Sequence, residues 1–198
     1  LLEGGETLDV DRLLGRGPHA VPGKTRLAVV NTQFLGDAEA VDFWLAQFLS
    51  AVDRWRAKTP APEGRLQAVF LFDEAEKYLP ASGKLPSTRA PLESLLRRGR
   101  SAGIGVFLAS QSPGDFDYRA RDQILTWLVG KVGQPVAINK LKPLFDAARL
   151  DASAQLPGQA AGQFVLLKEA EGCAIRADRN LIPTLQLPED RTLILSRG

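Results

Sequence analysis

The stretch Ala68-Val-Phe-Leu-Phe-Asp73-Glu74-Ala75 joins a run of apolar residues directly to two carboxylates. A short apolar run with a β-branched residue and two aromatic rings predicts a buried strand. Acidic side chains at the end of a buried strand are costly unless they have a partner or a function. This stretch alone fits two interpretations equally well: a site that uses both carboxylates, or an exposed strand end that only begins a loop.

A second apolar run, residues 104–110, ends in Gln111, and a predicted helix over residues 91–102 separates the two runs. Strands that alternate with helices predict an α/β fold with a mainly parallel sheet flanked by helices, and ligands of such sheets bind at the carboxyl ends of the strands. Asp73, Glu74 and Gln111 are the candidates at those ends. A turn cap would also explain Gln111, but polar tips on two neighbouring strands favour a nucleotide-hydrolase site.

The remaining pattern predicts further elements. In chain order, we expect a strand at residues 26–31, a helix over 41–55 capped by Asp37, a helix from Asp117 to 128, a strand at 129–136, a helix around 141–148, and a C-terminal β-hairpin of 162–167 and 173–176.

Gly23-Lys24-Thr25 imitates the end of a phosphate-binding loop, G-x-x-x-x-G-K-[ST]. The first glycine of that motif would stand at the position of Pro18, and no apolar strand precedes it. The loop must also open a helix, whereas residues 26–31 have the pattern of a strand. We therefore expect the phosphate-binding loop to lie in an earlier part of the same polypeptide.

The composition limits the remaining possibilities. The net charge of +2 is too small to indicate nucleic-acid binding by itself, and a single cysteine, Cys173, excludes an internal disulfide and a cysteine-rich zinc site. No apolar run reaches the ~18–20 residues of a transmembrane helix, and the first residues lack the pattern of a signal peptide. We therefore expect a cytoplasmic protein with no transmembrane segment in this chain. Because the chain starts with Leu1 and has no methionine, we interpret it as a fragment of a longer protein.

The ordered set of motifs resembles the HerA/FtsK group of RecA-like motor ATPases, which includes the conjugation and type IV secretion ATPases. It consists of Phe70-Leu-Phe-Asp73-Glu74-Ala75 followed by Arg97-Arg98-Gly99-Arg100-Ser-Ala-Gly-Ile-Gly-Val-Phe-Leu-Ala-Ser-Gln111-Ser-Pro113. The group's pattern is a strand ending in Asp-Glu-Ala, a helix ending in Arg-x-x-Gly and a strand closing in Ala-(Thr/Ser)-Gln-x-Pro. Order and spacing match from Arg26 to Gly133, and residues 156–165 resemble the group's final hairpin.

The resemblance implies ATP and Mg²⁺ as ligands and a role for each candidate residue. Asp73 would serve the magnesium ion, Glu74 would be the catalytic base, and Gln111 would sense the γ-phosphate. Arg100 would act on the nucleotide of a neighbouring subunit, with Arg97 and Arg98 as alternatives, although plain solvent exposure explains these arginines equally well. The implied assembly is a homo-oligomer, a hexameric ring, with DNA as its partner.

The resemblance also implies a division of the chain. Residues 1–25 would form a connector or edge segment, 26–180 the C-terminal part of a RecA-like ATPase domain, and 181–198 a tail. The leading hypothesis is the Walker B and sensor part of an ATP-hydrolysing DNA translocase or helicase, inactive as an isolated fragment. Two alternatives stay open: a catalytically silent RecA-like module for assembly or regulation, and a secretion or conjugation motor.

Overall fold

The structure is a computed structural model that describes residues 8–61, 64–112, 114–178, 185, 188 and 191. The chain forms two compact units, Leu1–Leu125 and Thr126–Gly198. Helices and strands occur in both units, which confirms the predicted α/β class. Most of the predicted tail, 181–198, lies outside the described residues.

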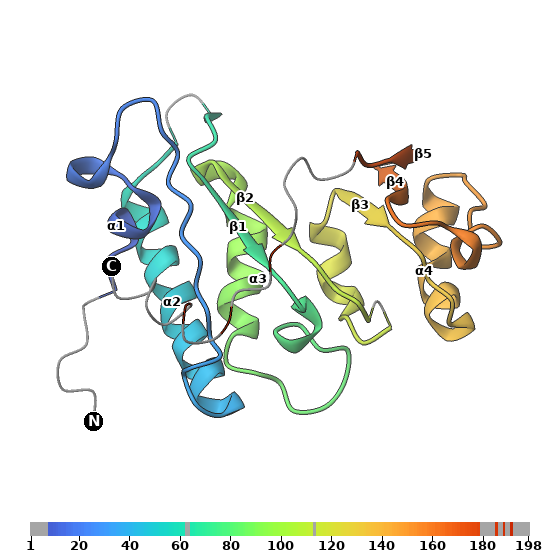
Figure 1. The fold of residues 1–198 in the computed structure, drawn as a ribbon, viewed down its shortest axis with the longest axis horizontal. Helices are drawn as coiled ribbons and strands as arrows, with labels where there is room; N and C mark the ends of the chain where they lie inside the picture. The colour runs from blue at the N-terminus through green and yellow to red at the C-terminus, as the bar shows by residue number, and fades with distance from the viewer. Residues whose placement is uncertain are drawn as a thin grey trace. The chain divides into compact units, whose positions relative to one another are not determined.

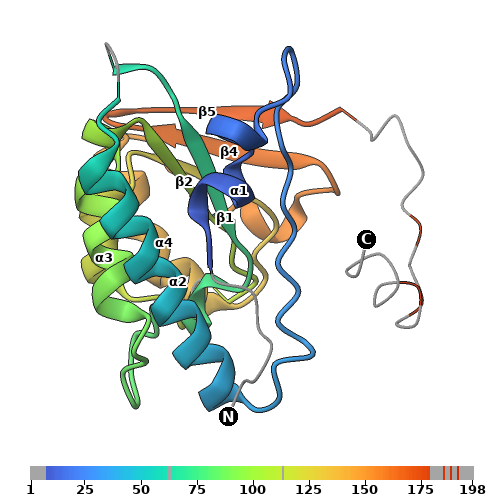
Figure 2. The ribbon, with the colours of Figure 1, turned by 90° about the vertical axis from the view of Figure 1, so that its left-hand side faces the viewer.

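The first unit is built on two parallel strands, β1 (Ala68–Phe72) and β2 (Ile104–Leu108), both of which were predicted from the sequence. The strands pair in register from Ala68 opposite Ile104 to Phe72 opposite Leu108. Two helices, α2 (Ala38–Lys58) and α3 (Arg89–Arg98), lie on one side of this pair (Figures 1 and 2). The parallel arrangement brings the carboxyl ends of both strands to the same edge of the sheet.

Apolar stripes on the two helices form the core of this unit. Leu49 and Val52 of α2, and Leu92 and Leu95 of α3, are at most 2% exposed. The ring of Phe48 on α2 meets that of Phe70 on β1 edge to face, with centroids 5.8 Å apart. Burial of such side chains contributes roughly 1.5–3 kcal/mol each and fixes α2 against α3, while the Phe48–Phe70 contact joins α2 to β1.

The start of α2 confirms the predicted cap. The Asp37 side chain accepts a hydrogen bond from the backbone N–H of Ala40 at 2.8 Å, which satisfies a donor that the first helical turn leaves free. A short helix, α1 (Val10–Leu14), joins the other end of α2 through a hydrogen bond of 2.8 Å from the Trp55 indole to the Asp11 carboxylate.

A tight turn leads from α3 into β2. The 3₁₀ helix η4 (Arg100–Ala102) ends at Gly103, whose φ is +64°. A Cβ atom at Gly103 would lie 2.1 Å from the carbonyl oxygen of Arg65, so only glycine fits this turn. The Gly103 carbonyl accepts hydrogen bonds from the N–H groups of Gln67 and Ala68, which sets the register of β2 against β1.

The predicted strand at residues 26–31 is wrong. The segment is not part of a strand, and Leu27 and Val29 are 86% and 84% exposed. Figure 1 shows it within the long connection from α1 to α2. An apolar run becomes a strand only when a neighbouring strand pairs with its backbone, and local pattern does not supply that neighbour.

The helix predicted from Asp117 to residue 128 and the strand predicted at 129–136 are also wrong. This region forms the 3₁₀ helix η5 (Tyr118–Gln123), the strand β3 (Thr126–Val129) and then the start of α4 (Pro135–Ala147). Asp117 directly precedes η5, and its side chain forms an ion pair with Arg89. Pro135 suits the first turn of α4, because proline has no N–H to leave unpaired there.

The second unit contains an antiparallel sheet in the order β3-β4-β5, with β4 (Gln163–Lys168) and β5 (Glu171–Arg176). The β4-β5 pair confirms the predicted hairpin, with the turn at Glu169 and Ala170. The predicted helix at 141–148 is confirmed as part of α4. Side chains of these elements and of the 3₁₀ helix η6 (Leu156–Gly158) form one core: Val129, Leu141, Phe145, Ala148, Ala152, Leu156, Val165 and Leu167.

Candidate functional site

Backbone hydrogen bonds continue the pairing of β1 and β2 past the strand ends. The N–H of Ala109 donates to the carbonyl of Phe72 at 2.9 Å, and the N–H of Ala75 donates to the carbonyl of Ala109 at 2.8 Å. On one chain segment, these two bonds lie on either side of Asp73 and Glu74. On the other, both are made by Ala109, the first residue of the segment 109–112, which is called the Gln111 segment. The structure therefore brings the three predicted residues to one edge of the sheet.

The backbone of Glu74 is left-handed, with φ 52° and ψ 48°. Only three described residues other than glycine have a positive φ, and a left-handed residue costs roughly 1–2 kcal/mol. The Glu74 N–H donates to Asp73 Oδ1 at 2.9 Å, so the bend also orients the neighbouring carboxylate. Strained backbone of this kind is concentrated at functional sites.

Lys77 contacts the Glu74 carboxylate, with its Nζ 2.5 Å from Glu74 Oε2. Both residues belong to the turn of the 3₁₀ helix η3 (Ala75–Lys77), for which Glu74 is the N-cap residue. The hydrogen bond to Glu74 raises the pKa of Lys77 above its ordinary value, so Lys77 is charged at neutral pH. Lys77 was not predicted as a site residue; its position three residues after a strand-end acid is the signal that was available.

Asp73 and Gln111 are exposed at the strand ends. Two surface hollows lie elsewhere in this unit. The larger is lined by residues of α1 and α2, including Asp11 and Trp55, and by Asp9 and His19 on neighbouring segments, and the smaller is lined by α3 and η5 residues, including Arg89 and Arg97. Neither hollow is lined by Asp73, Glu74 or Gln111.

Arg100 lies at the other end of β2. It belongs to η4, which precedes the strand, whereas Gln111 follows the strand. The five residues of β2 span roughly 16 Å. Arg100, Arg97 and Arg98 are not brought to the chain's own Asp73 and Glu74, and Arg100 is exposed at its end of the strand.

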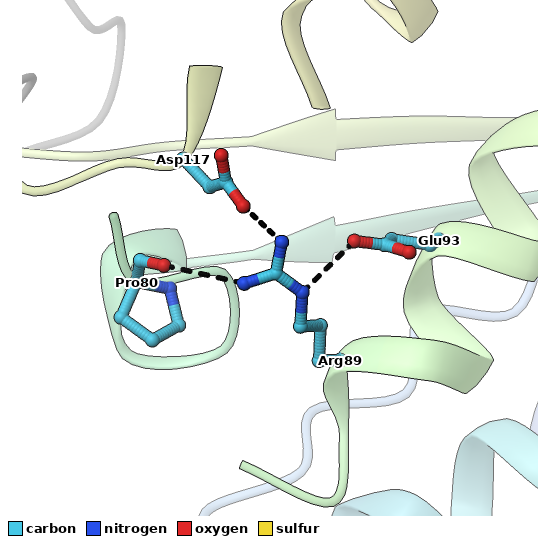
Figure 3. A network of polar contacts seen from close by, with 4 residues as sticks. All are labelled: Pro80, Arg89, Glu93 and Asp117. Carbon is cyan, nitrogen blue, oxygen red and sulfur yellow. Dashed lines mark hydrogen bonds and ion pairs between the residues drawn. The ribbon is translucent and has the colours of Figure 1, made fainter. Parts of the chain in front are cut away.

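A buried ion-pair network supports the segments that follow the site residues (Figure 3). The Arg89 guanidinium pairs with the Asp117 carboxylate and with Glu93 Oε1 at 3.0 Å, and donates to the carbonyl of Pro80 at 3.5 Å. Pro80 follows the turn of residues 74–77, which is called the Glu74 turn, and Asp117 follows the Gln111 segment. Arg89 therefore links the two chain segments that leave the candidate site.

Arg89 was not predicted from the sequence, although a signal existed. It is the first residue of α3, where the helix dipole disfavours a positive charge. A cation at that position indicates a specific carboxylate partner. The side chain of Arg89 is 12% exposed and that of Asp117 is 9% exposed, so both charges depend on the pairing.

Gly23-Lys24-Thr25 forms a turn rather than a phosphate-binding loop. The Lys24 N–H donates to the carbonyl of Val21 at 3.1 Å, and the next helix, α2, begins only at Ala38. Successive N–H groups at a helix N-terminus, which cradle phosphates in such loops, are therefore missing at this segment. The rejection of this motif as a phosphate-binding loop is confirmed, although the residues that follow are extended chain and not a strand.

No protein-family model and no curated protein matches the chain. Solved structures do match it. The genome packaging NTPase B204 from Sulfolobus turreted icosahedral virus 2 in complex with ATP-gammaS has a TM-score of 0.57 and 15% identity, over 89% of this chain and 74% of B204. The complex of B204 with AMPPCP has a TM-score of 0.59 and 14% identity, over 88% of this chain and 73% of B204.

VirB4 of Thermoanaerobacter pseudethanolicus also matches, with a TM-score of 0.56 and 15% identity, over 86% of this chain and 48% of VirB4. At these identities the likeness is one of fold. The chain thus shares its fold with B204, a genome packaging NTPase, and with VirB4. The resemblance to motor ATPases of the HerA/FtsK type is confirmed at that level.

No helix among the described residues is both long enough and apolar enough to cross a membrane.

Proposed function

We propose that the chain is the Walker B and sensor part of a RecA-like ATPase motor of the HerA/FtsK type, a DNA translocase or helicase. One observation carries the proposal: Asp73, Glu74 and the Gln111 segment meet at the carboxyl ends of two hydrogen-bonded parallel strands. The likeness in fold to B204 and VirB4 rests on the backbone and not on these residues, so it supports the proposal independently.

Asp73 fits a magnesium site of the kind that a nucleotide completes. Magnesium in such sites is held by one or two carboxylates, by waters and by the substrate phosphates. Asp73 is exposed, and the Glu74 N–H holds one of its oxygens. The described part of the chain has no group of three or more His, Cys, Asp or Glu side chains that could hold a metal alone, so phosphate oxygens are needed as well.

Glu74 and Gln111 would then have different roles in the hydrolysis of ATP. Bound MgATP would supply the γ-phosphorus as electrophile and the charge compensation for the leaving group. Glu74 accepts a proton from the attacking water, which needs one free carboxylate oxygen directed at that water. The Gln111 amide has both a donor and an acceptor, so it can contact a γ-phosphate oxygen and orient the water.

Two further parts would complete such a site. The phosphate-binding loop would lie in an earlier part of the polypeptide, upstream of Leu1. Arg100 would reach the nucleotide of a neighbouring subunit in a hexameric ring, because it lies at the opposite end of β2 from the site of its own chain. Residues 1–25, 26–180 and 181–198 would then be a connector, the C-terminal part of the ATPase domain and a tail.

Turnover of ATP by the assembly that contains the chain tests the proposal. Glu74→Gln should abolish turnover, by a factor of about 10² or more, while nucleotide binding is retained, because the amide cannot accept the proton from water. Glu76→Gln, two residues along the same turn, is the matched control and should keep turnover within about two-fold of the wild type. Equal turnover of Glu74→Gln and the wild type would remove the assigned base.

The fold also suits two other functions, each with an observation in its favour. A catalytically silent RecA-like module is favoured by Gly23-Lys24-Thr25, which imitates a phosphate-binding loop without forming one, and it predicts that the assembly binds partners without hydrolysing ATP. A secretion or conjugation motor is favoured by the likeness to VirB4. Stimulation of turnover by added double-stranded DNA would distinguish the DNA motor from a motor whose cargo is a protein.

A further inference from the structure

The candidate base is already engaged by a cation of its own chain. Lys77 Nζ lies 2.5 Å from Glu74 Oε2. An ammonium group at this distance occupies lone pairs of Glu74 Oε2, so this oxygen is not available to an attacking water.

The backbone that carries Lys77 is fixed. The Lys77 N–H donates to the Glu74 carbonyl at 2.9 Å, and Ala75 and Leu79 on either side of Lys77 are fully buried. The Leu79 carbonyl accepts from the Asp117 N–H at 2.8 Å, and Arg89 holds the adjacent Pro80 (Figure 3). The contact with Glu74 therefore follows from the fold of the turn.

The two charged groups, in contrast, can separate at low cost. The side chain of Lys77 is 63% exposed and that of Glu74 is 46% exposed. Exposed pairs contribute little because water solvates both charges when they part. A ligand that carries several negative charges, such as a triphosphate, can therefore compete for the Lys77 ammonium.

We propose that Lys77 restrains Glu74 while the site holds no nucleotide, and that a bound nucleoside triphosphate releases Glu74 by drawing the Lys77 ammonium to its phosphate oxygens. The inference rests on the proposed role of Glu74 as base. It makes Lys77 a positioning residue, which acts on the reaction through Glu74 and couples water activation to the presence of nucleotide.

Carbodiimide coupling tests the contact without reference to turnover. The reagent joins a carboxylate and an amine that touch, with loss of one water, so mass spectrometry should find Lys77 linked to Glu74 in the nucleotide-free protein. Mg²⁺ with a non-hydrolysable ATP analogue should lower the yield of this link several-fold. The exposed pair Lys84–Glu39, 3.4 Å apart, is the internal control and should give the same yield in both states. Absence of the Lys77–Glu74 link, or a yield that the nucleotide does not change, would overturn the proposal.

Turnover tests the consequence. Lys77→Met should raise the KM for ATP, by no more than about five-fold, because the variant loses the contact between the ammonium and the phosphate oxygens. Its kcat should stay within about two-fold of the wild-type value, because bound nucleotide has already separated Lys77 from Glu74. Lys77→Arg should restore the wild-type KM because a guanidinium also binds phosphate oxygens, and Lys84→Met should have no effect. The double variant Glu74→Gln, Lys77→Met should be inactive, since Glu74 is the base. An unchanged KM for Lys77→Met would overturn the release of Glu74 by nucleotide.

The two proposals fail in different ways. Turnover that survives Glu74→Gln removes the base, and with it the restraint. Loss of turnover in Glu74→Gln together with an unchanged KM for ATP in Lys77→Met removes the restraint alone. A wild-type assembly that binds ATP without hydrolysing it contradicts both.

Discussion

Arg89 shows how a single buried charge holds the candidate site together. Its guanidinium contacts Pro80, which follows the Glu74 turn, and Asp117, which follows the Gln111 segment. The same two segments also meet through backbone bonds from Asp117 N–H to the Leu79 carbonyl and from Ala81 N–H to the Asp115 carbonyl. The strained backbone of Glu74 is thus embedded in a rigid surrounding, which is the condition for such strain to persist.

Removal of the Arg89 charge should destabilise the protein strongly. Arg89→Met removes the guanidinium that pairs with the Asp117 carboxylate, which is 9% exposed, and loss of one partner of a buried pair costs about 3–5 kcal/mol. Urea denaturation of the variant and the wild type measures the difference in the free energy of unfolding. Lys84→Met is the control, because it breaks an exposed pair and should change this free energy by less than about 0.5 kcal/mol. A loss below about 1 kcal/mol for Arg89→Met would contradict the structural role of the network.

At the scale of elements, α2 caps the start of α3. The Asp42 carboxylate on α2 accepts from the backbone N–H groups of Ser87 and Thr88 at 2.8 and 3.1 Å, and from the Thr88 hydroxyl at 3.1 Å. Thr88 is fully buried and its own side chain does not cap the helix. A carboxylate at a helix N-terminus also interacts favourably with the helix dipole. Asp42 therefore joins the two helices that cover the strands.

The Asp42 cap should make stability depend on pH. Burial alone would raise the pKa of Asp42, but the hydrogen bonds from Ser87 and Thr88 outweigh it and place the pKa below its ordinary value of 3.8. A lowered folded-state pKa contributes stability above the unfolded pKa, and this contribution is lost as the pH falls through the folded pKa. Asp42→Asn should therefore be less stable than the wild type at pH 7 by about 1–2 kcal/mol, since hydrogen bonds to a charged acceptor are the stronger ones.

The difference between Asp42→Asn and the wild type should shrink below about pH 4 and disappear once the pH lies below the folded pKa, where the wild-type carboxyl group is also uncharged. Denaturation curves at several pH values from neutral down into this acidic range measure it. A difference that stays constant across this range would show that the charge of Asp42 is not what supports the cap.

Elements with a strong local signal were predictable from the sequence. The apolar stripe and Asp37 cap of α2, the apolar runs of β1 and β2, and the β4-β5 hairpin all carry their signal within a few residues. Residues 26–31 carry a strand pattern as well, but strand formation depends on a neighbour that lies elsewhere in the chain. The segment from Asp117 was mispredicted in its extent, because the helical element that follows it, η5, ends at Gln123 and β3 begins at Thr126.

The candidate site was predictable where residue type and position in the chain coincide. Asp73, Glu74 and Gln111 follow directly from the ends of apolar runs, and the rule for parallel sheets brings them to one edge. Lys77 and Arg89 were not predicted, because their contacts depend on the local turn and on tertiary packing. The left-handed backbone of Glu74 has no sequence signal, since glycine and asparagine are the residues that usually adopt it.

For the whole molecule, the position of Arg100 gives a prediction about assembly. Arg100 is about the length of β2 away from the acidic end of its own strand pair, so a role in hydrolysis requires a neighbouring subunit. Arg100→Ala subunits mixed into wild-type assemblies should lower ATP turnover by more than their share, because each defective arginine disables a neighbour's site. A loss of turnover that is proportional to the fraction of variant would argue against action in trans.

In the proposed function, the carboxyl ends of β1 and β2 form one nucleotide site. A structure of the ATP-hydrolysing assembly with Mg²⁺ and a non-hydrolysable ATP analogue tests this most directly. We predict that Asp73 binds the magnesium ion, at about 2.1 Å or through one water, and that the Gln111 side chain lies within about 3.2 Å of the γ-phosphate. A nucleotide bound elsewhere, with Asp73 and Gln111 facing solvent, would contradict the account.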